Sequence, residues 1–234
     1  MKILALKARL PVGLSLLVLT GGTALAQAPS GGAPTSINKP FVKLFGTVGP
    51  FTAKAEAQVF DQSQKETVRM PMDFALLEGK VRLEINLAQI QSKDLPASTI
   101  AGLKQAGMDR VISIFRPDKK LTYVLYPGIQ SYTSVPLAKE EAEVSEKNLK
   151  LEKTPLGKET IDGHACVKNK TVVKSGPGLA FEALTWNAAD LKDFPVQIEI
   201  KEKQSTVRMR FTQVQFAKLD VKQFDLPAKY SEMK

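Results

Sequence analysis

Apolar side chains alternate with polar ones along most of the chain, and this alternation restricts the possible folds more than any other feature. In the clearest run, residues 51–59, phenylalanine, alanine and valine occupy every second position, and polar or charged residues fill all four of the others. Positions two apart lie on one face of a β-strand. A strand with one apolar and one wet face is typical of antiparallel sheets. The pattern therefore predicts a mainly β protein.

The same period recurs between turn signals, such as Glu78-Gly79, where we expect a tight hairpin. Pro71 lies inside a predicted strand and indicates an edge position or a bulge there, because proline cannot donate a ladder hydrogen bond. The ranges predicted as strands are 51–59, 68–76, 81–87, 111–115, 121–126, 149–154, 164–173, 181–186, 196–201 and 207–216.

Two segments depart from this period, residues 94–108 and 136–149. The first has Ile100, Leu103 and Ala106 at helical spacing, and both segments read as short amphipathic helices. A sheet with one apolar face must close, stack on another layer, or be covered. We therefore expect a curved antiparallel sheet, or an unclosed β-barrel, lidded by these helices.

The largest apolar surface is predicted on one hairpin and the helix above it. This surface would line a site for a hydrophobic ligand, and its residues are Met70, Met72, Phe74, Leu83, Ile85 and Leu103. Methionines adapt to flexible chains, which suits such a site. Ordinary core filling is the alternative interpretation.

The N-terminus has the three parts of a secretory signal. Basic residues precede an apolar stretch from Leu10 to Leu19, and Ala24-Leu25-Ala26 supplies the small residues of a cleavage site. We expect residues 1–26 to be a signal peptide, cleaved before Gln27, and the mature protein to be periplasmic or secreted. A retained anchor is the alternative, but the apolar run is shorter than the roughly 20 residues of a spanning helix.

Residues 27–40 are rich in proline, glycine and serine and read as a flexible linker. No composition break divides residues 41–234, which we expect to form a single domain. The chain has 33 basic and 24 acidic residues, but its lysines lie mostly beside acids or in turns. This distribution argues against nucleic-acid binding and allows at most peripheral contact with an anionic membrane.

A single histidine and a single cysteine restrict the chemistry. They exclude an internal disulfide and metal sites that need several such ligands. His164 and Cys166 lie two apart on a predicted strand and are interpreted as structural, with redox chemistry or metal binding as alternatives. No nucleophile elbow, Walker loop or zinc-protease helix is found. The sequence predicts no enzyme activity, no cofactor and no metal.

Three stretches of the C-terminal half carry a recognisable pattern. They are Gly-x-Glu-x-Ile-x-Gly-x-x-Cys over residues 157–166, Trp-x-x-x-Asp-Leu-x-x-Phe-Pro over residues 186–195, and residues 224–230. With the region around Arg116 to Tyr132, they resemble a family of exported bacterial proteins of unknown function, over most of residues 67–230.

That family is similar in outline to lipoprotein carriers of the LolA and LolB type, which are unclosed β-barrels whose helices lid an apolar cavity for acyl chains. The resemblance implies a non-catalytic carrier with a lipid or lipoprotein as its partner. The alternative is an envelope protein of the same fold, filled solid, that serves in interaction or structure.

Overall fold

The strands join into one continuous curved sheet. The computed structural model describes residues 37–175 and 178–233. The predicted signal peptide and residues 27–36 of the predicted linker lie outside these residues. Residues 37–234 form one compact unit.

Thirteen strands make up the sheet. They are β1 (Phe51–Asp61), β2 (Glu66–Leu77), β3 (Lys80–Asn86), β4 (Gln91–Ser92), β5 (Arg110–Arg116), β6 (Leu121–Tyr126), β7 (Ser131–Pro136), β8 (Leu149–Ile161), β9 (His164–Ser175), β10 (Gly178–Ala188), β11 (Phe194–Lys201), β12 (Ser205–Phe216) and β13 (Ser231–Glu232). The helices are α1 (Lys39–Lys43), α2 (Ala97–Gln105) and α3 (Lys139–Glu143). Short 3-10 turns are η1 (Leu87–Gln89), η2 (Pro127–Ile129), η3 (Glu146–Asn148), η4 (Ala189–Leu191) and η5 (Val221–Phe224).

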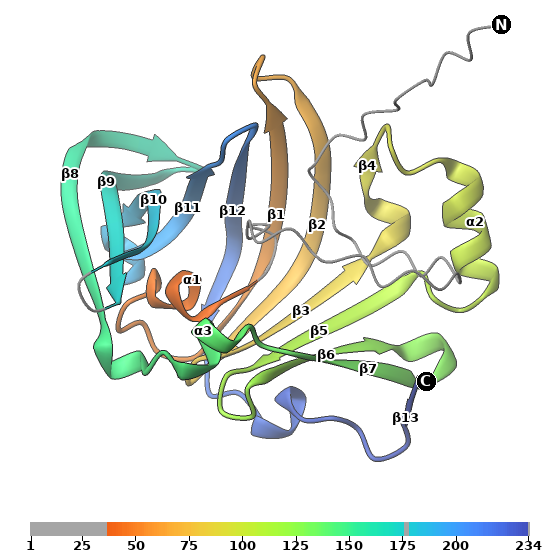
Figure 1. Cartoon of the computed structure of the whole chain (residues 1–234). Coiled ribbons are helices and arrows are strands. Elements are labelled where there is room, and N and C mark those ends of the chain that lie inside the picture. Colours follow the sequence, from red (N-terminus) through yellow and green to blue (C-terminus); the bar gives the residue numbers. More distant parts are fainter. Residues whose placement is uncertain (1–36, 176–177, 234) are drawn as a thin grey trace, which may run out of the picture. The chain divides into compact units, whose positions relative to one another are not determined.

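The strand order is β13-β7-β6-β5-β3-β2-β1-β12-β11-β10-β9-β8, with β4 added beside β2. Among the described residues, all strand pairings are antiparallel except that of β13 with β7. The sheet curls at both ends without closing, and α1 lies inside the curve (Figure 1). The prediction of a mainly β fold built on an unclosed, curved antiparallel sheet is confirmed.

Pro71 lies where β2 changes partners. On one side it faces Glu56 of β1, without interruption of the ladder. On the other side β2 pairs with β4 up to Arg69 and with β3 from Met72 onward. Pro71 falls in the gap between these pairings, where no hydrogen bond from its nitrogen is needed. The interruption that the sequence indicated at Pro71 is therefore present.

Helix α1 and the two residues after it place buried side chains inside the curve, although the sequence did not indicate this helix. Asn38 caps the helix, its side chain accepting from the Phe41 amide at 2.8 Å. Phe41, Leu44 and Phe45 are buried. The ring of Phe45 lies 5.2–5.6 Å from four other phenylalanine rings, Phe51, Phe74, Phe194 and Phe211. This phenylalanine cluster joins the turn after α1 to β1, β2, β11 and β12.

The two predicted helices form, but they pack differently from the expectation. Neither α2 nor α3 has a buried side chain. The main neighbour of α2 is η1, and Leu103 is only half-buried. Each helix is too short and carries too few apolar residues to cover the sheet, so the expected lid needs correction. Inside the curve, the firmly packed helix is α1.

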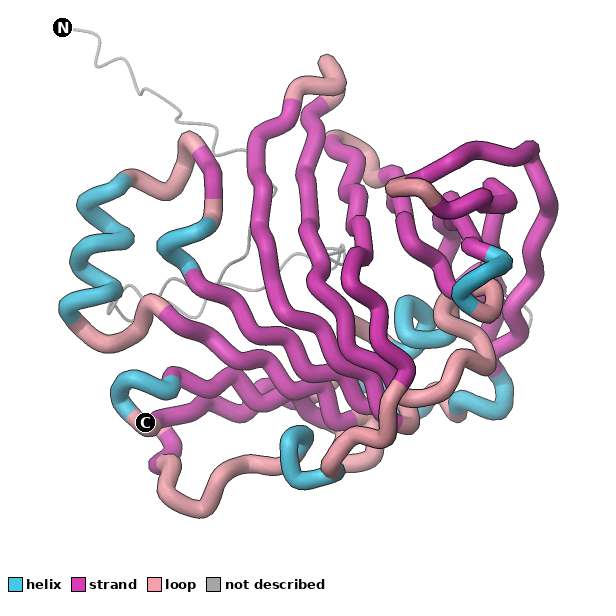
Figure 2. The backbone as a smooth tube through the Cα atoms, turned by 180° about the vertical axis from the view of Figure 1, so that it is seen from behind, coloured by secondary structure: helices cyan, strands magenta, loops and turns pink. Residues whose placement is uncertain are grey.

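The C-terminal segment covers part of the convex face, seen from behind in Figure 2. Phe224 of η5 is fully buried there, in a cluster with Ile112, Ile114 and Leu125. The buried guanidinium of Arg116 donates to the Phe224 carbonyl at 2.8 Å and also pairs with the Asp225 carboxylate. Charge-assisted bonds of this kind fix the segment in place.

We predict that Phe45→Ala removes about 3–5 kcal/mol from the free energy of unfolding, because it leaves a cavity among four rings. Phe60→Ala is the matched control. Phe60 is half-buried on the outer face, where it contacts Arg208, so its loss should cost only about 1 kcal/mol. Denaturant titration measures both values, and equal losses would contradict the assigned role of Phe45.

Candidate ligand-binding site

The inner face of the central sheet carries no charged side chain among the described residues. The register places Ala55 of β1 between Met72 of β2 and Phe211 of β12, on the face that contacts Phe45. The inward positions are Phe51, Ala53, Ala55, Ala57 and Val59 on β1, Val68, Met70, Met72, Phe74 and Leu76 on β2, Val81, Leu83 and Ile85 on β3, Val207, Met209 and Phe211 on β12, and Val196, Ile198 and Ile200 on β11.

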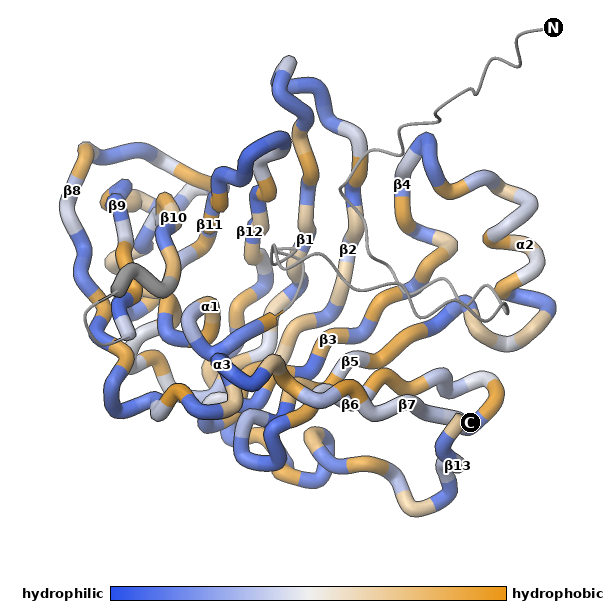
Figure 3. The backbone as a smooth tube through the Cα atoms, viewed as in Figure 1, coloured by the Kyte–Doolittle hydropathy of each residue, from blue (hydrophilic) through white to orange (hydrophobic). Residues whose placement is uncertain are grey.

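The outward positions of the same strands are largely polar, so apolar and polar residues alternate along each tube in Figure 3. Charged pairs run across the outer face, for example Lys54 with Asp73 and Arg208 with Glu199. The apolar lining therefore comes directly from the period-two pattern of the sequence.

Five of the six predicted ligand-binding residues come together. Met72 pairs with Ile85 and Phe74 with Leu83, and these four side chains are buried. Met70 is the next inward residue of β2 and is half-buried. Leu103 belongs to α2 and not to this group of paired strands.

A row of small side chains runs down the middle of the lining, and its role was missed from the sequence. Ala55 lies between Met72 and Phe211, and Ala57 lies between Met70 and Met209. With Ala53, these alanines form a row of small side chains along β1, and we call this row the alanine furrow. The signal was present in the sequence, because alanine occupies alternate positions where the neighbouring strands carry larger side chains.

Polar side chains interrupt the lining near the curled end of the sheet. Asn169, Thr171, Thr185 and Asn187 of β9 and β10 are all buried. The Asn187 side-chain oxygen accepts from Asn169 at 3.1 Å and from Thr185 at 2.7 Å, and the two threonine hydroxyls are 2.7 Å apart. The hydrogen bonds within this ladder offset the cost of burial, which fits a structural role.

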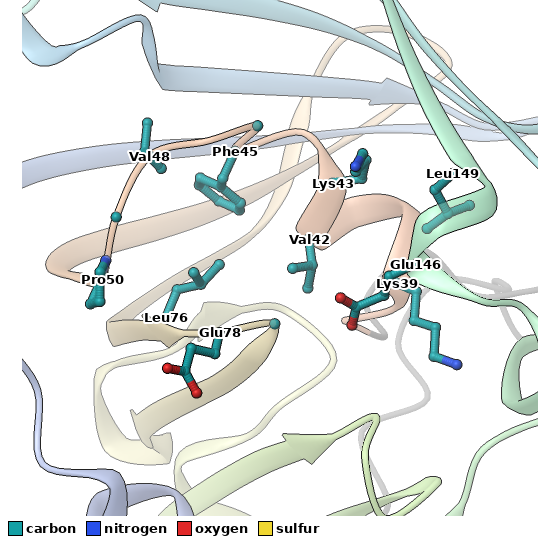
Figure 4. Close-up of a pocket in the computed structure, with 13 residues that line it drawn as sticks. Lys39, Val42, Lys43, Phe45, Val48, Pro50, Leu76, Glu78, Glu146 and Leu149 are labelled. Atoms are coloured by element: carbon teal, nitrogen blue, oxygen red, sulfur yellow. The ribbon is translucent and has the colours of Figure 1, made fainter.

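A separate cavity of about 320 Å³ opens at the base of the fold, beside α1 (Figure 4). We call it the base cavity. Its apolar wall includes Val42, Phe45, Val48, Leu76 and Leu149. Charged residues also line it, namely Lys39, Lys43, Glu78 and Glu146.

The His164–Cys166 pair does not form a nucleophile and base. The His164 ring lies 2.7 Å from an Asp190 carboxylate oxygen, while the Cys166 thiol donates to the His164 backbone carbonyl at 3.4 Å. Burial raises the pKa of the Cys166 thiol, so the thiol stays protonated at neutral pH. Across the described residues, no group of three or more histidine, cysteine, aspartate or glutamate side chains is placed to hold a metal ion.

The two motifs over residues 157–166 and 186–195 contact each other in the structure, where they connect β8, β9, β10 and η4. Glu159 of the first motif accepts from the Trp186 indole of the second at 2.7 Å. Lys168 lies over the Trp186 ring and pairs with Glu159. Phe194, near the end of the second motif, belongs to the phenylalanine cluster. These motif residues therefore hold the curled end of the sheet together.

The sequence matches no protein-family model and no curated protein. In structure the chain is similar to a LolA superfamily protein from Nitrosomonas europaea, with 9% identity, a TM-score of 0.42, and coverage of 80% of this chain and 94% of that one. It is also similar to LprF from Mycobacterium bovis, with 15% identity, a TM-score of 0.40, and coverage of 82% and 95%. The lipoprotein LppX from Mycobacterium tuberculosis is 11% identical, with a TM-score of 0.39 and coverage of 78% and 94%. At such identities the similarity is one of structure alone.

We predict that the Cys166 thiol of the folded protein reacts with Ellman's reagent at least about 100-fold more slowly than in the denatured chain. Cys166 is 2% exposed, and its pKa is raised. The reagent therefore reaches the sulfur slowly, and only a small fraction of the thiol is in the reactive thiolate form. The reaction is followed by absorbance, with the guanidinium-unfolded protein as control. Fast labelling of the native protein would reopen the possibility of a reactive site at Cys166.

Proposed function

We propose that this chain is an exported binding or carrier protein for a hydrophobic ligand, a lipid or the acyl chain of a lipoprotein. The observation that supports this most directly is the uncharged inner face with the alanine furrow along β1. Binding of this kind requires a dry apolar surface and no catalytic group.

The furrow matches an extended acyl chain in length and chemistry. From Ala53 to Val59 the strand advances roughly 20 Å at about 3.3 Å per residue. Each buried methylene contributes about 0.8 kcal/mol, so a fully buried chain of a dozen methylenes gains roughly 10 kcal/mol, which is comparable in size to the cost of association. The methionines on both sides, Met70, Met72 and Met209, can adjust to chains of different shape.

The proposed localisation is the periplasm or the medium, and the signal peptide predicted in residues 1–26 would direct the export. In the part of the chain that the structure describes, no helix is long and apolar enough to cross a membrane. The competing proposal is an envelope protein that uses the same fold for interaction or structure, with no ligand in the furrow. Whether the furrow takes up a ligand distinguishes the two proposals.

We predict that Ala57→Leu weakens the binding of a dansyl-labelled fatty acid at least about tenfold, because the larger side chain fills the furrow floor between Met70 and Met209. Gln58→Leu is the matched control. Gln58 is the next residue of β1 and donates to Glu66, so its side chain is not part of the furrow. Fluorescence titration gives the Kd of each protein.

Thermal unfolding of both variants checks that the fold is intact. Equal Kd values for the wild type and Ala57→Leu, with both folded, would contradict the furrow as the site. If the wild-type protein binds no apolar probe at all, the envelope-protein alternative is favoured.

A further inference from the structure

One connection of the chain runs from one end of the sheet to the other. It joins β7, near the β13 end, to β8, the outermost strand of the opposite end. We call its residues 137–148 the strap. In Figure 1 the strap carries α3 past the base of α1 before the chain enters β8.

The strap is fixed at its two ends and weakly packed between them. The Leu137 amide donates to the Lys120 carbonyl at 2.9 Å, and Leu149, just beyond the strap, is buried. In between, α3 and η3 have no buried side chain, and residues 137–148 include four glutamates and two lysines. A segment without buried apolar anchors opens at low free-energy cost.

Lys39 of α1 holds the middle of the strap through two hydrogen bonds. Its ammonium donates to the Val144 carbonyl at 2.8 Å, and its backbone amide donates to Glu141 Oε1 at 3.0 Å. Lys39 is 7% exposed, which is unusual for a lysine. Because Phe41 and Leu44 anchor α1 in the core, opening must move the strap and break both bonds.

The strap also forms part of the wall of the base cavity. Glu146 and Lys39 both line that cavity (Figure 4). The Glu146 carboxylate lies against the turn between β2 and β3, so close that a Cβ on Gly79 would be 2.8 Å from its Oε1. Opposite the strap, Phe45 connects the cavity to Phe74 and Phe211, at the lower end of the alanine furrow.

We propose that the strap is a gate over the base cavity, that Lys39 is its latch, and that the gate admits the apolar end of a lipid or acyl chain. The ligand class rests on the proposed function, whereas the latch itself does not. The base cavity is then a second site of about 320 Å³, with an apolar wall for the chain and charged residues around it, and it is covered by a movable segment.

Lys39→Met tests the latch, because methionine fills similar space but cannot donate to Val144. Hydrogen exchange of the full mature chain, read by mass spectrometry, is expected to quicken about tenfold over residues 137–148, the effect of one lost charge-assisted bond. Lys139→Met is the matched control. Lys139 is an exposed lysine of the strap itself, it does not line the cavity, and no hydrogen bond from its side chain is found among the described residues.

Glu141→Ala removes the other contact from the strap side, where no side chain of α3 is buried, so it cannot disturb the sheet. It should quicken exchange of the Lys39 amide and of the strap in the same way. If neither variant changes the rate of hydrogen exchange in the strap, the proposal that Lys39 holds the strap is wrong.

Release of a bound dansyl-labelled fatty acid, measured by stopped flow, tests the gate. Faster release in Lys39→Met but not in Lys139→Met supports it. Faster strap exchange with an unchanged release rate would overturn the gate while leaving the latch. If no fatty acid binds to the wild-type protein, the proposed function fails, and the exchange data still decide the latch.

Discussion

The packing of Phe45 against four strands is the interaction on which the rest of the structure depends. A sheet that curls without closing leaves its two ends unpaired with each other, so no continuous ladder fixes the curvature. Phe45 reaches Phe51, Phe74, Phe194 and Phe211 from the inside and ties β1, β2, β11 and β12 around one ring. Edge-to-face and tilted ring contacts add directional preference to this apolar burial.

The phenylalanine cluster divides the inner face into two parts that differ in the size of their side chains. At the base, α1 and the phenylalanine rings fill the curve. Along β1 the lining falls to alanines, bordered by methionines and phenylalanine. On the convex side, ion pairs and the C-terminal segment held by Arg116 stabilise the opposite face. The proposed binding therefore uses the face whose lining is apolar and uncharged.

Alternation predicted most of the sheet because period two is a direct consequence of strand geometry. It missed β4, β7 and β13, since two of these have only two residues and β7, SYTSVP, does not alternate cleanly. It also missed α1, whose five residues follow a proline-rich stretch and are too few to show a helical period. The predicted helices were found, but their burial was overestimated, because burial depends on packing partners that periodicity does not identify.

For the candidate site, the large apolar side chains could be predicted from the sequence, but the role of the small alanine side chains could not. Met70, Met72, Phe74, Leu83 and Ile85 were selected for size and hydrophobicity, and the strand register places them together. The row of alanines can be recognised only when Met209 and Phe211 are known to pair with it. That pairing joins β1 to β12, about 150 residues apart in sequence, and alternation within one strand does not predict it. Leu103 was included because its helix was expected to cover these strands, and the sequence does not determine where that helix packs.

The carrier function is tested most directly by mass spectrometry of the lipids that the mature protein carries when it is purified from its own host. A carrier of this kind is expected to hold an acyl-bearing molecule in a roughly equimolar amount with the protein. Recovery of no more acyl lipid than an unrelated exported protein of similar size retains through the same purification would contradict it.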